Sequence, residues 1–115
     1  MNVIFFQVDN VLNFPGSEAK APDGSMGISE ARAKALKKKA DANSAKIVLF
    51  GSWAKDWNFD DAKCTVRGTY LNKKLNRRGL HILDKVESEN DIPAWLQRKS
   101  NVGSYIILKE WDENG

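Results

Sequence analysis

The stretch V-I-F-F-Q-V-D-N at residues 3–10 decides the fold of this chain. Its first four residues are apolar and favour β structure, and Gln7 and Asp9 then alternate with Val8 before a turn-prone asparagine. A strand whose consecutive side chains are all apolar is typical of a parallel sheet covered on both faces. We therefore predict a buried strand from Val3 to Val8, at the centre of such a sheet.

Three further apolar runs repeat this pattern, at Ile47–Phe50, Leu80–Leu83 and Tyr105–Leu108. Segments of helical composition separate the four runs. We predict one helix after the N-cap residue Ser29, a second that ends at Gly79, and a third that begins at Asn90 or Asp91 and ends near Asn101. Alternating strands and helices indicate an α/β protein. The predicted fold is a three-layer, Rossmann-like domain with a mainly parallel sheet of about four strands.

Length and composition limit the class of protein. The 115 residues fit one domain, which we assign to residues 1–115, and the net charge of +3 neither requires nucleic acid nor excludes it. No apolar run approaches the ~20 residues that span a bilayer, so no membrane partner is expected. The start of the chain lacks a basic leader and a cleavage site, which indicates a cytoplasmic protein.

Several conspicuous side chains are given structural roles. We expect Asn43 on the buried side of the first helix, Cys64 inside the second helix and His81 in the third strand. One Cys and one His also exclude a zinc finger. Trp53 and Trp57 are expected to pack a loop onto the sheet edge rather than to stack on bases, because large aromatic side chains are usually buried.

Ligands of open parallel sheets bind beyond the carboxyl ends of the strands. The string FFQVDNVLN at the first strand end resembles the start of the haloacid dehalogenase (HAD) superfamily, in particular the small branch of Swiss army knife RNA-repair proteins that begins with DxDGVLN. IVLFGSW resembles the SSSWR-like string that follows the second strand of that branch. DIPAWLQ and YIILKEWDE are similar to its EI-x-x-WL helix and its last acidic pair. The resemblance covers nearly the whole chain in the right order and implies a HAD-like fold.

The resemblance assigns roles to the residues of the first strand end. In the family the first Asp of DxD attacks phosphorus, and the second is the general acid or base. Gln7 occupies the nucleophile position and Asp9 the position of the general acid or base. An amide forms no acyl-phosphate, so the resemblance implies that Gln7 is inactive and that Asp9 is a remnant of the site. Asp9 is then expected to cap a turn or to pair with Lys109.

The other parts of the family site are changed as well. The phosphate-binding hydroxyl corresponds to Phe50, with Ser52 as a substitute only if the loop is shifted, and the metal-binding acidic pair corresponds to Lys109 and Glu110. Asp9 and Glu110 would be the remaining metal ligands, in a site that an ammonium group at Lys109 disrupts. No cofactor is therefore expected, and Mg²⁺ only if the chain is an enzyme after all.

Three functions follow as expectations. The first is a HAD-like domain without phosphatase activity that binds a protein or a phosphorylated ligand. The second is a divergent Mg²⁺-dependent phosphohydrolase. The third is a nucleic-acid-binding module that uses the basic clusters at residues 37–39 and 73–78. The family pattern continues with another helix and strand after the acidic pair. A sheet without this strand has an exposed edge, which a dimer would cover.

Overall fold

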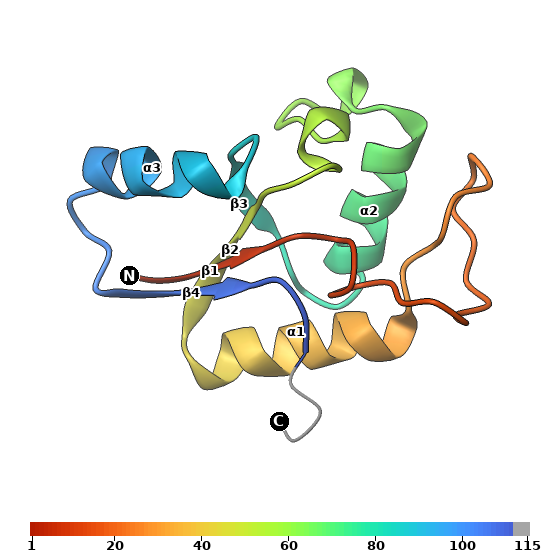
Figure 1. Ribbon diagram of the computed structural model, residues 1–115, viewed down its shortest axis with the longest axis horizontal. Helices are drawn as coiled ribbons and strands as arrows, with labels where there is room; N and C mark the ends of the chain where they lie inside the picture. The colour runs from red at the N-terminus through yellow and green to blue at the C-terminus, as the bar shows by residue number, and fades with distance from the viewer. Residues whose placement is uncertain (112–115) are drawn as a thin grey trace.

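The structure is a computed structural model and describes residues 1–111. Within these residues the chain forms a four-stranded, all-parallel sheet in the order β3-β2-β1-β4 (Figure 1). The strands are β1 (Asn2–Phe6), β2 (Ala45–Leu49), β3 (Ile82–Lys85) and β4 (Ser104–Leu108). The predicted α/β class and parallel sheet are confirmed, and β1 lies between two neighbouring strands, as its apolar sequence predicts.

Helices cover both faces of the sheet and complete three layers (Figure 1). The α-helices are α1 (Glu30–Ala42), α2 (Val66–Asn76) and α3 (Ile92–Arg98). The connections contain the short 3-10 helices η1 (Ala54–Asp56), η2 (Asp61–Lys63) and η3 (Glu89–Asp91). The larger core lies under α1 and α2, and the smaller core lies under α3.

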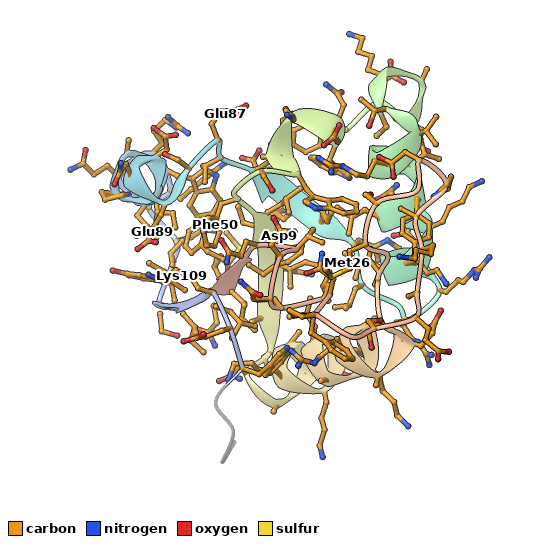
Figure 2. All side chains as sticks on the ribbon, turned by 45° about the vertical axis from the view of Figure 1, so that its right-hand side comes forward. Asp9, Met26, Phe50, Glu87, Glu89 and Lys109 are labelled. Carbon is orange, nitrogen blue, oxygen red and sulfur yellow. The ribbon has the colours of Figure 1, made fainter. Side chains whose placement is uncertain are left out.

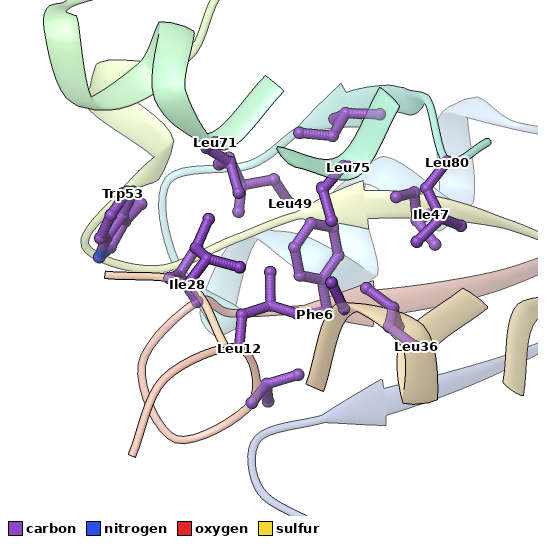
Figure 3. Close-up of a cluster of buried hydrophobic side chains, with 14 of the residues drawn as sticks. Phe6, Leu12, Ile28, Leu36, Ile47, Leu49, Trp53, Leu71, Leu75 and Leu80 are labelled. Atoms are coloured by element: carbon purple, nitrogen blue, oxygen red, sulfur yellow. The ribbon is translucent and has the colours of Figure 1, made fainter. Parts of the chain in front are cut away.

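Successive side chains of β1 enter the two cores alternately. Ile4 and Phe6 belong to the core under α1 and α2, part of which Figure 3 shows, whereas Val3 and Phe5 belong to the core under α3. All four side chains are buried. Burying one such side chain contributes about 1.5–3 kcal/mol to folding, so this short strand is a main source of stability.

Short polar signals set the ends of the helices. The Ser29 hydroxyl accepts a hydrogen bond from the Arg32 backbone N–H at 3.3 Å, which confirms it as the N-cap of α1. Thr65 caps α2 in the same way through the backbone N–H of Gly68. α2 ends at Asn76, before the predicted Gly79, which adopts φ +77° in the turn that follows.

The third strand begins two residues later than predicted, because its first apolar residue closes the preceding helix. The backbone N–H of Leu80 donates to the carbonyl of Leu75 at 3.0 Å. His81 therefore lies before β3 and is exposed, so its predicted place in the strand was wrong. The strand instead includes Asp84, whose carboxylate accepts a hydrogen bond from Trp95 Nε1 at 2.8 Å.

Two further side chains differ from their predicted places. Cys64 lies between η2 and α2 in extended backbone, outside any helix. Asn43 is exposed, because its side-chain amide donates to the carbonyl of Lys39 at 2.8 Å and so ends α1. The third helix also ends earlier than predicted, at Arg98.

Gly68 permits a close approach between α2 and η1. A Cβ atom at this position would overlap the backbone carbonyl of Asp56. A backbone group cannot rotate away from such a clash, as the end of a flexible side chain can. Gly68→Ala normally favours a helix, but here we expect it to destabilise the fold by about 1–3 kcal/mol through overpacking. Gly103→Ala is the control, since its Cβ would meet no atom closer than 3.6 Å. Urea unfolding measures both, and equal midpoints would contradict the prediction.

Candidate functional site

The carboxyl ends of β1, β2 and β4 carry the residues that the sequence singles out. We call Gln7, Asp9, Ser52 and Lys109 the strand-end cluster. Because the three strands are parallel and in register, their carboxyl ends lie at the same edge of the sheet. Figure 2 shows Asp9 and Lys109 at this edge.

Asp9 accepts hydrogen bonds from three side chains. Ser52 Oγ donates to Oδ2 at 2.8 Å, while Asn13 Nδ2 at 3.1 Å and Trp53 Nε1 at 3.3 Å donate to Oδ1. Asn13 in turn accepts from the backbone N–H of Asn10, which adopts φ +68°. The carboxylate therefore holds the turn after β1 against the loop after β2, and the structure brings together Asp9 and Ser52.

Gln7 is engaged with the neighbouring strand. Its Nε2 donates to the backbone carbonyl of Lys109 at 3.0 Å, and its Cβ would lie 3.3 Å from a Cβ built on Gly51. This contact, together with the φ of +95° at Gly51, makes glycine the favoured residue there. The amide thus bridges β1 and the end of β4.

Lys109 pairs with a different carboxylate from the one predicted. Its Nζ lies 3.2 Å from Glu89 Oε1 on η3, and no ion pair within residues 1–111 joins it to Asp9. The long side chain of Lys109 reaches the acid of an adjacent connection, while Asp9 is already bonded to Ser52 and Trp53. The predicted Asp9–Lys109 pair was wrong, and the alternative role of Asp9 in a turn is the one observed.

The arrangement does not suit a magnesium ion. Glu110 is exposed and makes no hydrogen bond or ion pair within the described part of the chain. No group of three or more His, Cys, Asp or Glu side chains in residues 1–111 is placed to hold a metal ion. Magnesium prefers oxygen ligands, and the ammonium group of Lys109 at this edge of the sheet repels a divalent cation.

Phe50 does not lie in the strand-end cluster. Its side chain is 2% exposed and packs in the core under α3 with Phe5 and Trp95. The position that the resemblance aligns with the phosphate-binding hydroxyl therefore lies in a core and not at the strand ends, because the residue after β2 points to the opposite face from Leu49. The hydroxyl that reaches Asp9 is that of Ser52.

A second polar network next to the cluster was not predicted. Asp56 is buried and accepts from Arg67 Nη2 at 2.6 Å and from Thr65 Oγ1 at 2.9 Å. The Arg67 guanidinium also lies 4.3 Å from the centre of the Trp53 ring. Trp53 and Trp57 are 2% and 4% exposed, so the packing interpretation is confirmed. In the sequence, the network is visible only as an Asp within an aromatic stretch that is followed later by an Arg. That pattern is too common to predict the network.

Comparisons with known proteins supply no relative. No protein-family model matches the chain, and no curated protein and no solved structure matches it. Within residues 1–111, no helix is both long enough and apolar enough to cross a membrane. The HAD resemblance therefore depends on the strings in the sequence.

The hydrogen bonds of Asp9 predict its contribution to stability. Asp9→Ala removes the acceptor of three donors, and a hydrogen bond to a charged group contributes about 1.5–3 kcal/mol. Asp9 is exposed, so water replaces part of what is lost, and we expect a total loss of about the size of one such bond. Asp41→Ala, which removes only an exposed i,i+4 pair with Lys37, should cost less than about 0.5 kcal/mol. Chemical unfolding compares the two, and equal effects would show that Asp9 does not hold the loops together.

Proposed function

We propose that this chain is a HAD-like domain that acts by binding and does not transfer phosphoryl groups. The observation that carries the proposal is Gln7 at the position of the nucleophile. A covalent phosphoryl-enzyme intermediate requires a carboxylate oxygen that attacks phosphorus, and a carboxamide offers no such nucleophile.

The contacts of the strand-end cluster support a structural role for the former site. Gln7 is bonded to the Lys109 backbone, Asp9 to three side chains, and the Lys109 ammonium to Glu89. A general acid or base exchanges a proton with its substrate, whereas both oxygens of Asp9 accept hydrogen bonds from protein side chains. The side chains that would contact a phosphate therefore form hydrogen bonds and an ion pair with each other and with the neighbouring loops.

The competing function is a divergent Mg²⁺-dependent phosphohydrolase. It would use Asp9 and Glu110 as metal ligands and would need a nucleophile other than Gln7. Ser52 is the nearest hydroxyl to Asp9, at 2.8 Å, so this function would require the Asp9–Ser52 pair to open toward a substrate.

Activity assays separate the two functions. We expect no Mg²⁺-dependent hydrolysis of generic phosphomonoesters above background, because Gln7 offers no carboxylate nucleophile and Lys109 stands at one of the metal-carboxylate positions of the family. The same assay on Asp9→Ala and on Ser52→Ala is the control for contaminating phosphatases. Turnover that depends on Mg²⁺ and disappears in both variants would overturn the proposal and favour the phosphohydrolase.

Restoring the site predicts a graded outcome. Gln7→Asp alone should give no appreciable rate, because the ammonium of Lys109 remains, and groups that act as a unit are strongly non-additive. Gln7→Asp with Lys109→Asp adds two carboxylates beside Asp9, so like-charge repulsion should lower the melting temperature and Mg²⁺ should raise it again. Phe50→Ser is unsuited to this series, since removing the buried ring costs about 3–5 kcal/mol.

The readout of that series is the response of the melting temperature to Mg²⁺. If Mg²⁺ does not change the melting temperature of the double variant, positions 7, 9 and 109 do not form one site. The residue-by-residue match to the family would then be abandoned.

A further inference from the structure

A groove along the outer side of α2 shares no residue with the strand-end cluster. Its volume is about 520 Å³, within the ~300–1,000 Å³ range of sites for small molecules. α2 and its C-cap Arg77 form one wall, and Pro22 and Cys64 complete the lining. We call it the α2 groove.

The α2 groove carries an excess of positive charge. Lys73 and Arg77 are exposed, and their side chains make no ion pair within residues 1–111. Lys74 Nζ lies 2.7 Å from Glu30, but Arg78 shares the same carboxylate at 2.8 Å, so one negative charge faces two positive ones. Hydrogen bonds from Lys74 and Arg78 lower the pKa of Glu30 to about 2, and it is ionised at neutral pH. Among residues 1–111, no acidic side chain lines the groove.

Hydroxyl groups add neutral donors between these cations. The Tyr70 hydroxyl oxygen accepts from the backbone N–H of Ile28 at 2.9 Å, which leaves its own O–H to donate. Thr69 is half-buried in the same wall. Ammonium, guanidinium and hydroxyl donors in one groove are the groups that bind phosphate oxygens.

An exposed aromatic ring, that of Phe59, directly follows the residue whose backbone contacts the Cys64 wall of the groove. Phe59 is 68% exposed and meets Trp57 edge to face, with ring centres 5.0 Å apart. The neighbouring Asn58 backbone N–H donates to Cys64 Sγ at 3.2 Å, which places this segment against the Cys64 wall. Val66, 64% exposed, gives the groove a further apolar surface.

We propose that the α2 groove binds single-stranded nucleic acid, with the phosphates on Lys73 and Arg77 and a base stacked on Phe59. A charged groove that follows the backbone, with an aromatic platform for a base, is how sequence-tolerant single-strand binding is built. At ~1.5 Å rise per residue, Lys73 and Arg77 are about 6 Å apart along the helix, and the whole of α2 extends over about 16 Å, enough for a few nucleotides. The inference names a ligand for the binding role proposed above and rests on it.

A titration with labelled oligouridylate of about twelve nucleotides tests this inference, with fluorescence anisotropy at about 50 and 200 mM salt. Two phosphate contacts on a single strand give a logarithmic salt slope near −1.4, so the higher salt should weaken binding about sevenfold. Lys73→Glu with Arg77→Glu should weaken binding at least tenfold at the lower salt. Lys34→Glu with Lys38→Glu is the matched control, because it changes the charge equally on exposed residues of α1 outside the groove.

Two single variants separate the charge from the aromatic platform. Glu30→Gln releases Lys74 and Arg78, so it should tighten binding and steepen the salt slope. Phe59→Ala should weaken binding about tenfold without changing the salt slope, since stacking releases no counterions. Circular dichroism and melting temperature confirm that each variant is folded.

The inference is overturned by absence of binding at low salt or by equal losses in the two double variants. Equal affinity for free uridine monophosphate would indicate a nucleotide pocket, and binding only to acidic lipid vesicles would indicate a membrane surface; either result also overturns it. Magnesium-dependent phosphatase activity would contradict the proposed function without altering this titration, so the two failures are distinguishable.

Discussion

The position of β1 between β2 and β4 is the constraint on which the rest of the structure depends. Phe6 is in register with Leu49 on one side and with Leu108 on the other, and its carbonyl accepts from the Phe50 N–H at 2.9 Å. Since the strands are parallel and in register, the residues that follow them meet at one edge. The strand-end cluster is thus a consequence of burying an apolar strand on both faces, before any chemistry is considered.

Polar contacts then decide what that edge does. Asp9 links the loops after β1 and β2, and Gln7 links β1 to the end of β4. Each bond uses a donor or acceptor that a phosphoryl-transfer site would present to its substrate. An edge with these contacts is suited to holding loops in place, whereas the exposed Lys73 on α2 makes no ion pair within residues 1–111.

The sequence predicts the fold better than the site, for physical reasons. Apolar runs such as Val3–Phe6 are predicted correctly, because a strand without polar side chains has to be buried on both faces. The start of β3 is not, because the backbone of Leu80 bonds to the end of the preceding helix. The contact between Asp9 and Ser52 follows from their positions, because both residues come after the carboxyl ends of neighbouring parallel strands. The partner of Lys109 does not, because a long side chain selects among several carboxylates by three-dimensional distance. The bond between Arg67 and Asp56 has no local pattern that would reveal it.

The four tryptophans of the chain each donate their indole N–H to a different part of the molecule. The acceptors are the Asp9 carboxylate for Trp53, the Asn72 amide for Trp57, the Asp84 carboxylate for Trp95 and the Val11 carbonyl for Trp111. The bond of Trp53 joins the loops after β1 and β2, and that of Trp57 joins the end of η1 to α2. The bond of Trp95 joins α3 to β3, and that of Trp111 joins the segment after β4 to the turn after β1. A chain labelled with fluorotryptophan therefore contains four separate spectroscopic reporters, one for each junction between its elements, with no added probe.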